Sequence, residues 1–298
     1  MRVLVTGGTG YVGRFIVEAM LREGFEVIVA GRQPPRSDLF SAPVAFRPLD
    51  LDPDTDQTAL LEGVDWMVHG AFDHVAGKYR GGEGDDPTRF IRLNREGSIA
   101  LFETAKAHGV RRALFLSSRA VYGPQGRPTV LTEETLAKPD TRYGQVKLDV
   151  ERALSDLASE DFVAASLRVT GVYGAHCAGA DHKWQRLFSD FLAGRSIAPR
   201  IATEVHGDDV AQAALLLLRH ETAGSVAGRT FNVSDILLDQ RDLLARVASL
   251  LDVPIQLPPP GDPASVDVMD CTAIQGLGWR PGGFEKLYAV LPDLVRTL

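Results

Sequence analysis

A tyrosine and a lysine four residues apart, Tyr143 and Lys147, could exchange protons if they lie on one helix. Residues spaced i and i+4 share a face of an α-helix. An ammonium group beside a phenol favours the phenolate and lowers the pKa of the phenol from about 10 towards neutrality. Such a phenol can donate or accept a proton in a reaction near neutral pH. The same spacing also occurs in many helices as exposed packing, so the pair alone does not establish a site.

Two hydroxyl groups, those of Ser117 and Ser118, lie upstream of this pair at the end of an apolar run that begins at Ala113. The run predicts a strand. In open parallel sheets, ligands bind beyond the carboxyl ends of the strands. A hydroxyl at this point could hold a substrate oxygen against Tyr143, and the residues alone leave either serine as the candidate.

A glycine-rich segment, Thr6 to Gly13, follows the first predicted strand and opens the first predicted helix. Glycines permit a tight turn and a close approach of the backbone to a pyrophosphate, and the helix N-terminus offers free N–H groups and a positive dipole end. The context of strand, turn and helix therefore predicts a dinucleotide site. Its expected contacts are Gly7, Gly10, Tyr11, Val12 and Gly13.

The end of the second predicted strand bears on the choice of dinucleotide. An acidic residue about 20 residues after the glycine turn usually binds the ribose 2′-hydroxyl of NAD, whereas a basic residue accommodates the 2′-phosphate of NADP. Here Arg32 stands at that place, with Arg36 close behind it. This favours NADP over NAD, unless Arg32 is a solvated loop cation. Asp50 and Leu51 follow the third strand, where Asp50 could accept a hydrogen bond from the adenine amine or could be an exposed turn acid.

The elements that would position these groups alternate strictly between strand and helix through the first two thirds of the chain. This alternation predicts a doubly wound α/β fold with a parallel sheet. We expect a dinucleotide-binding domain at residues 1–168, to which residues 205–235 return, and a smaller substrate-binding region at residues 169–204 and 236–298. The predicted strands are 2–5, 26–30, 66–70, 113–117, 163–168 and 230–233, and the main helices are 11–23, 89–108, 143–158, 208–219 and 240–251.

Taken together, these motifs resemble the extended short-chain dehydrogenase/reductase family, and within it the NAD-dependent epimerase/dehydratase branch. The resemblance covers most of the chain. It rests on TGGTGYVG at 6–13, VHGA at 68–71, LNREG at 93–97, FLSSRAVYG at 115–123, YGQVK at 143–147, LRVTGVYG at 167–174, HGDDVA at 206–211, FNVSD at 231–235 and LGWRP at 277–281.

The resemblance implies a Rossmann fold and assigns roles to particular residues. Ser118, not Ser117, resembles the hydroxyl of the family site, and Tyr143 resembles its general acid/base. Lys147 resembles the residue that lowers the pKa of the tyrosine and binds the nicotinamide ribose. Asn94, Gly70 and Ala71 resemble residues that line the cofactor site. Members of the family commonly pair through the helices at 89–108 and 143–158, so a homodimer is expected.

Two departures from the family pattern concern the reaction and the substrate. Dehydratases of the family have an acidic pair after the catalytic hydroxyl, where this chain has Arg119 and Ala120, so dehydration is disfavoured. Enzymes for sugar nucleotides usually have an arginine seven residues before Asp209, where this chain has Ala202. Arg200, Arg168 or Lys183 could reach the same anion instead. A free sugar, a uronate or another small hydroxy-carbonyl compound is therefore a candidate substrate.

Composition excludes several other classes of function. The chain has 298 residues and a net charge of −7, which disfavours nucleic acid and anionic membranes as partners. Its two cysteines, Cys177 and Cys271, show no ligand spacing, and the histidines are scattered, so we expect no metal site and no disulfide framework. No run of about 18 apolar residues and no leader segment is present, so we expect a cytoplasmic protein.

The sequence thus leads to the hypothesis of an NAD(P)-dependent oxidoreductase or epimerase. It would transfer hydride at a secondary alcohol or carbonyl carbon, of a sugar or sugar derivative, with Ser118, Tyr143 and Lys147 at the site. One alternative is an NADPH-dependent reductase of a small carbonyl compound that is not a sugar. A second alternative is a sensor that binds the dinucleotide without turnover.

Overall fold

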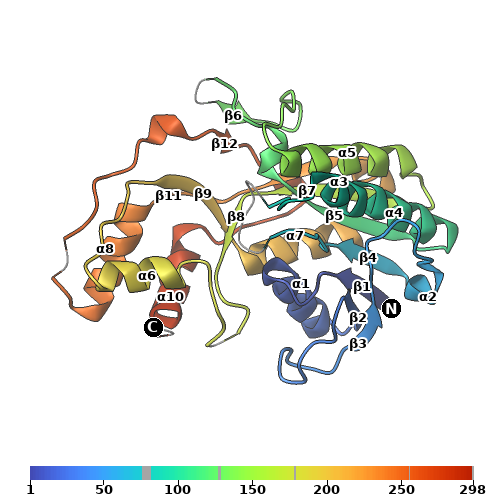
Figure 1. Ribbon diagram of the computed structural model, residues 1–298, viewed down its shortest axis with the longest axis horizontal. Coiled ribbons are helices and arrows are strands. Elements are labelled where there is room, and N and C mark those ends of the chain that lie inside the picture. The colour runs from blue at the N-terminus through green and yellow to red at the C-terminus, as the bar shows by residue number, and fades with distance from the viewer. Residues whose placement is uncertain (76–81, 127–128, 178, 255, 297–298) are drawn as a thin grey trace.

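The computed structural model describes residues 1–298 except 76–81, 127–128, 178, 255 and 297–298. Its centre is a seven-stranded parallel sheet with the order β10-β7-β5-β4-β1-β2-β3 (Figure 1). The predicted doubly wound fold is confirmed. The strands are β1 (Arg2–Thr6), β2 (Glu26–Gly31), β3 (Ala45–Pro48), β4 (Trp66–His69), β5 (Arg112–Ser118), β7 (Val163–Val169) and β10 (Thr230–Val233).

Helices cover both faces of this sheet because successive strand residues point to opposite sides. Val3 and Val5 of β1 pack with α1 (Tyr11–Arg22) and α7 (Gly207–Arg219) in one buried cluster. Leu4, between them, belongs to the opposite cluster with α4 (Gly97–Ala107) and α5 (Arg142–Leu157). The nearly continuous apolar runs of the strands therefore reflect burial on both faces.

The predicted helix at 89–108 is divided into three parts. It consists of α3 (Pro87–Ile91), a π-helical turn at Arg92–Glu96 and α4. The division coincides with a close approach of chain segments, since a Cβ on Gly97 would lie 1.7 Å from the carbonyl oxygen of Leu51. Glycine at this position lets α4 pack directly against the loop after β3. The short α2 (Thr58–Leu61) precedes β4.

The C-terminal part forms a second, smaller layer, at the left of Figure 1. A three-stranded sheet has the order β11-β9-β8, with β8 at Gly171–Tyr173, β9 at Ile201–His206 and β11 at Ile236–Asp239. Three helices, α6 (Gln185–Leu192), α8 (Gln240–Leu251) and α10 (Gly283–Val295), share a separate apolar core with it. The exact division of the chain into two domains stays a prediction.

Minor elements complete the fold. A two-stranded sheet joins β6 (Val130–Leu131) to β12 (Val268–Met269), and α9 (Thr272–Gly276) lies between β12 and α10. Strands β6, β8 and β12 have only two or three residues each, so their patterns are too short to predict a strand from sequence alone. No described helix is long and apolar enough to span a bilayer.

Candidate active site

The glycine turn has the geometry that its sequence predicts. Gly7 has a positive φ of 68°, and a Cβ on it would lie 2.7 Å from the backbone nitrogen of Ala71. A Cβ on Gly13 would lie 2.2 Å from the carbonyl oxygen of Gly7. Gly10 is the N-cap residue of α1, and as a glycine it offers no side chain that could bond the first N–H groups of the helix. Its N–H groups are therefore available to an anion, and the tight turn leaves room for a pyrophosphate.

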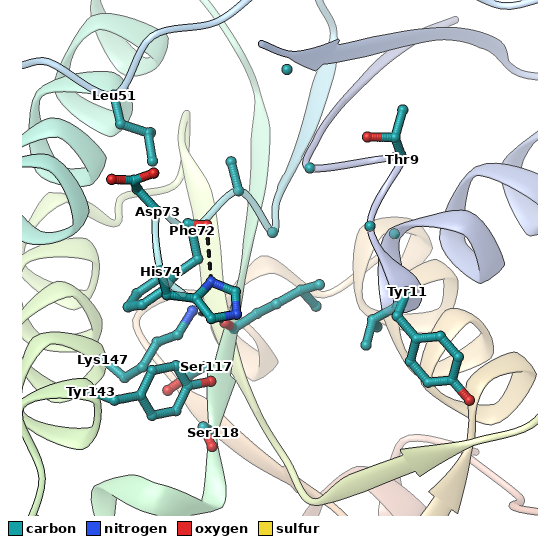
Figure 2. Close-up of a pocket in the computed structure, with 18 of the residues that line it drawn as sticks. Thr9, Tyr11, Leu51, Phe72, Asp73, His74, Ser117, Ser118, Tyr143 and Lys147 are labelled. Atoms are coloured by element: carbon teal, nitrogen blue, oxygen red, sulfur yellow. Dashed lines mark hydrogen bonds between the residues drawn. The ribbon is translucent and has the colours of Figure 1, made fainter. Parts of the chain in front are cut away.

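The turn forms one wall of a cavity of about 640 Å³. Figure 2 shows Thr9 and Tyr11 on the side of α1, and Ser118, Tyr143 and Lys147 on the opposite side. The structure thus brings thirteen of the fourteen predicted site residues to one cavity. They are Gly7, Gly10, Tyr11, Val12, Gly13, Arg32, Asp50, Leu51, Gly70, Ala71, Ser118, Tyr143 and Lys147.

Lys147 is buried, and its ammonium group is held on several sides. It donates a hydrogen bond of 2.7 Å to the carbonyl oxygen of Leu116. It lies 4.4 Å from the ring centre of Phe72, 4.5 Å from that of Phe115 and 5.7 Å from that of Tyr143. Burial lowers the pKa of Lys147 to about 7, and the carboxylate of Glu151 opposes this shift. The lysine is therefore able to gain or lose a proton near neutrality.

The pKa of Tyr143 is shifted in the direction opposite to the one expected from the sequence. Burial raises the pKa of its phenol, and a hydrogen bond with the side chain of Ser118 acts in the opposite direction. The lowered pKa expected from Lys147 is therefore wrong for the site as it stands in this structure. The reason is that the cost of desolvating a phenolate exceeds the influence of an ammonium group that is itself buried and bonded to Leu116.

The two serines have different partners. Ser117 donates to the carboxylate of Glu151, which also accepts from the guanidinium of Arg168 at 2.8 Å. Ser118 contacts Tyr143 and accepts from the backbone nitrogen of Ala120 at 3.2 Å. Ser118 is thus the serine that contacts the candidate acid/base, in agreement with the family resemblance.

Asn94 is the one predicted site residue that does not line the cavity. It is fully buried in the π-helical turn. Its side-chain oxygen accepts from the backbone nitrogen of Asp73 at 2.6 Å, and its side-chain nitrogen donates to the carbonyl oxygen of Asp73 at 2.7 Å. Asn94 therefore fixes the backbone of the segment after β4 and does not itself face a ligand.

In that segment, sequence reasoning missed Phe72 and Asp73, whereas it expected His74 in a loop that faces the substrate and assigned it no role. All three residues line the cavity. The ring of Phe72 meets that of Tyr143 edge to face, with ring centres 5.1 Å apart. The available signal was their position, because they directly follow Gly70 and Ala71 at the carboxyl end of a central strand.

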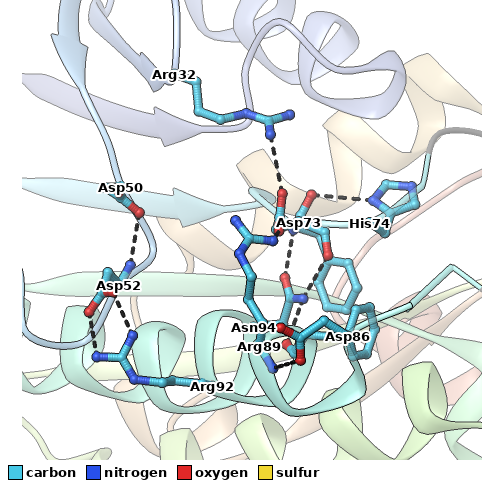
Figure 3. Close-up of polar contacts among 11 residues, drawn as sticks. Arg32, Asp50, Asp52, Asp73, His74, Asp86, Arg89, Arg92 and Asn94 are labelled. Carbon is cyan, nitrogen blue, oxygen red and sulfur yellow. Dashed lines mark hydrogen bonds and ion pairs between the residues drawn. The ribbon is translucent and has the colours of Figure 1, made fainter. Parts of the chain in front are cut away.

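Arg32, Asp73 and Arg89 form a cluster of charged side chains in the lining of the cavity. Arg32 forms an ion pair with Asp73 at 3.2 Å, and Arg89 forms a second one with Asp73 at 2.6 Å (Figure 3). Asp50 accepts a hydrogen bond from the backbone nitrogen of Asp52 within its own turn, at 3.0 Å. Arg32 is therefore a largely exposed cation that also pairs with a carboxylate in the cavity.

The three cations that could bind an anionic group of the substrate do not line this cavity; they are Arg168, Lys183 and Arg200. Arg168 is buried against Glu151 and does not line the cavity, so the suggestion that it binds the anion is wrong. Lys183 pairs with the buried carboxylate of Glu204. Ala202 and Arg200 line a separate small pocket, large enough for about one water molecule, together with Glu204.

No cluster of three or more histidine, cysteine or acidic side chains suited to a metal ion occurs in the described ranges of the chain. The two cysteines are unpaired, with Cys177 exposed and Cys271 buried.

Comparisons with known proteins identify the family. Residues 3–234 match the model of the NAD dependent epimerase/dehydratase family. The chain is 26% identical over 307 residues to UDP-glucose 4-epimerase of Corynebacterium glutamicum, covering 94% of this chain and 91% of that protein. It is 32% identical over 230 residues to the human UDP-glucose 4-epimerase, covering 70% of this chain and 65% of that one.

A solved structure of UDP-glucose 4-epimerase from Thermus thermophilus, in complex with NAD, is 26% identical and covers 99% of both chains, with a TM-score of 0.77. NAD is thus supported as the cofactor type, and the expected preference for NADP is not. The chain belongs to the NAD-dependent epimerase/dehydratase family and is an enzyme of the extended short-chain dehydrogenase/reductase type.

Proposed function

We propose that this enzyme is an NAD-dependent epimerase of a sugar or sugar derivative, with Ser118, Tyr143 and Lys147 as its catalytic residues. One observation carries the proposal. These three side chains converge on one wall of a cavity whose other wall is the glycine turn at the start of α1. A hydroxyl, a phenol and an ammonium group are thus placed across from a pyrophosphate site.

The residues present fit a nicotinamide dinucleotide. The backbone of Gly7 and Gly13 leaves a cradle that a Cβ would fill, and the uncapped α1 N-terminus offers its N–H groups to the pyrophosphate. Gly70 and Ala71 complete the wall beside Gly7. When bound there, NAD supplies a hydride acceptor and, once reduced, a hydride donor.

Each of the three side chains has a separate task in this proposal. Ser118 bonds the substrate oxygen and directs it to the phenol of Tyr143. Tyr143 takes the proton from the substrate hydroxyl during oxidation and returns it when the carbonyl is reduced on the other face. Lys147 places its positive charge beside the phenol and the nicotinamide ribose. Because burial raises the pKa of Tyr143, the phenol must release its own proton to solvent before the oxidative half begins, and the positive charge of Lys147 stabilises the phenolate that results.

For the substrate, we propose a compound with a secondary alcohol on a sugar ring. The similarity of the chain to UDP-glucose 4-epimerases supports this class. The paired Lys183 and Glu204, together with Ala202 in its separate pocket, support a free sugar or a uronate over a sugar nucleotide. The charge of Lys183 is already compensated by Glu204, so Lys183 offers little attraction to a diphosphate.

The same observation favours a second candidate function, that of a net dehydrogenase or reductase. An epimerase must retain its keto intermediate while the sugar ring rotates to present its other face to the cofactor. A nucleotide that stays bound to the protein anchors the intermediate during that rotation. Without such an anchor the oxidised product leaves after one hydride transfer. Lys183 and Glu204 therefore favour this alternative for a small sugar or another small carbonyl compound.

The test incubates the purified protein with NAD and, in turn, with UDP-glucose, UDP-galactose, free hexoses and uronates. Epimerisation gives a new diastereomer in the NMR spectrum without net formation of NADH, whereas a dehydrogenase gives NADH in equal amount to product. Tyr143→Phe is expected to lose either activity and to retain NAD binding. Undiminished turnover by Tyr143→Phe would remove the proposed roles, and NAD binding without any turnover would favour the sensor.

We further propose that the enzyme is a cytoplasmic homodimer that pairs through α4 and α5. The unpaired cysteines suit a reducing compartment. The exposed positions of both helices are mostly charged or small, as with Glu103 and Arg152, so the interface would be polar at its rim. Light scattering that gives the mass of a single chain would refute the dimer.

A further inference from the structure

Asp73 lies between two arginines in the lining of the cavity (Figure 3). One carboxylate oxygen bonds the guanidinium of Arg32 at 3.2 Å, and the other bonds that of Arg89 at 2.6 Å. All three residues line the cavity. The side chain of Asp73 is only 19% exposed, whereas that of Arg32 is 82% exposed. The carboxylate is thus the fixed member of the cluster, and Arg32 reaches in from the surface.

The topology explains why residues 41 positions apart meet. Strands β2 and β4 are the two neighbours of β1 in the parallel sheet, so their carboxyl ends flank the glycine turn. Arg32 directly follows β2, and Asp73 follows β4 after three intervening residues. In doubly wound folds the residue after the second strand faces the adenosine ribose. The ion pair thus sets the carboxylate of Asp73, which comes from the opposite strand, beside the side chain of the residue that follows β2.

We propose that Asp73 supplies the ribose-binding carboxylate that the second strand lacks, and that it makes the site select NAD over NADP. This inference rests on the proposed function, in which a nicotinamide dinucleotide occupies the cavity. Each carboxylate oxygen bonds one arginine and keeps a further lone pair for a ribose hydroxyl. A 2′-phosphate would instead meet the negative charge of Asp73, and it would have to draw Arg32 out of its ion pair.

The charges of the cluster predict that one substitution can shift the cofactor preference from NAD towards NADP. Two guanidinium groups and one carboxylate leave a single net positive charge. Asp73→Asn leaves two positive charges and releases Arg32, which is the arrangement that suits a 2′-phosphate. The backbone of residue 73 should not move, because Asn94 holds its N–H and its carbonyl group and not its side chain. Asp73→Asn is therefore expected to fold normally.

The experiment measures the dissociation constants of NAD and NADP by calorimetric titration, without substrate. Wild-type protein is expected to bind NAD about tenfold or more tightly than NADP, and Asp73→Asn should shift the ratio towards NADP by about tenfold. The double variant Arg32→Ala/Asp73→Asn should lose that gain. Asp38→Asn serves as the matched control, because Asp38 also pairs with an arginine, Arg36, but does not line the cavity. It should leave the ratio unchanged.

Either of two results would overturn the inference. One is a wild-type preference for NADP, and the other is a ratio that Asp73→Asn shifts no further than Asp38→Asn does. Both readouts are binding constants, so they are independent of turnover. A failure of the catalytic proposal, seen as unimpaired Tyr143→Phe, would leave this test intact, and failure here would leave the roles of Ser118, Tyr143 and Lys147 untouched.

Discussion

Ser117 donates a hydrogen bond to the buried carboxylate of Glu151, which lies one helical turn beyond Lys147 on α5. The same carboxylate accepts from the Nε and Nη2 atoms of Arg168, at 3.1 and 2.8 Å. Arg168 in turn donates to the hydroxyl oxygen of Tyr122 at 3.0 Å. The ends of β5 and β7 are thus tied to the helix that carries Tyr143 and Lys147, which fixes the wall of the cavity.

Glu151→Gln is expected to lower the free energy of unfolding by about 3 to 5 kcal/mol, because it leaves the buried guanidinium of Arg168 without a counter-charge. Arg168 is 6% exposed and Glu151 3% exposed, so water cannot replace the lost partner. Urea unfolding followed by circular dichroism measures the change. The control is Glu103→Gln, at an exposed position of α4, which should change stability by no more than about 0.5 kcal/mol. Equal midpoints for both variants would contradict the prediction.

Lys147 should make stability depend on pH in a defined window. Burial lowers its pKa from 10.5 to about 7 in the folded protein. Between these two values the unfolded chain binds the extra proton, so the folded state gains stability as pH rises from about 7 towards 10. Below pH 7 both states are charged, and the cost of burying the ammonium group is present in full.

The variant Lys147→Met removes this titration. As pH rises from about 7 towards 10, the free energy of unfolding of wild type is expected to increase relative to that of Lys147→Met. The expected increase is up to roughly 1.4 kcal/mol per pH unit. Urea midpoints of the two proteins without cofactor, taken from pH 6 to about 9.5 in steps, measure the slope. Two parallel pH profiles would show that the lysine is not shifted. The comparison cancels the contributions of other groups, since both proteins share them.

Local sequence signals predicted much of the site. The glycine turn, the serine pair and the spacing of Tyr143 and Lys147 each lie within one strand and one helix, where chain periodicity determines direction. The placement of Ser118, Tyr143 and Lys147 in one cavity followed from parallel strands whose carboxyl ends meet at one edge. These relations need no knowledge of side-chain burial.

The remaining features depend on contacts between distant segments. Arg32 meets Asp73 only because β2 and β4 flank β1, so its charge was overestimated as a signal for NADP. The raised pKa of Tyr143 results from burial, which a spacing of four residues does not reveal. Arg168 looked like a free cation because the buried carboxylate of Glu151 belongs to another element.

Gly13→Ala should weaken NAD binding by at least about tenfold and destabilise the protein by roughly 1 to 3 kcal/mol. The new Cβ would lie 2.2 Å from the carbonyl oxygen of Gly7 and 2.8 Å from the Cα of Gly8, so the turn must open. Gly224→Ala is the control, because a Cβ there meets nothing within 4 Å. Calorimetric titration with NAD and thermal unfolding are the measurements. Binding by Gly13→Ala at the wild-type level would mean that the pyrophosphate does not lie on this turn.

Asp209 joins the parallel sheet layer to the C-terminal helices, and its charge should matter for stability more than for cofactor binding. It is 1% exposed, accepts from the ammonium group of Lys286 on α10 at 2.7 Å and from the backbone nitrogen of Gly282 at 3.2 Å. Asp209→Asn should lower the free energy of unfolding by about 2 to 4 kcal/mol, since it removes the counter-charge of a partly buried ammonium group.

The matched control is the adjacent Asp208→Asn, at a side chain that is 37% exposed. It should lower the free energy of unfolding by less than about 1 kcal/mol. Neither residue lines the cavity, so both variants should retain the dissociation constant for NAD. If Asp209→Asn instead lost NAD binding at full stability, the residue would act on the cofactor site and not on the contact between α7 and α10.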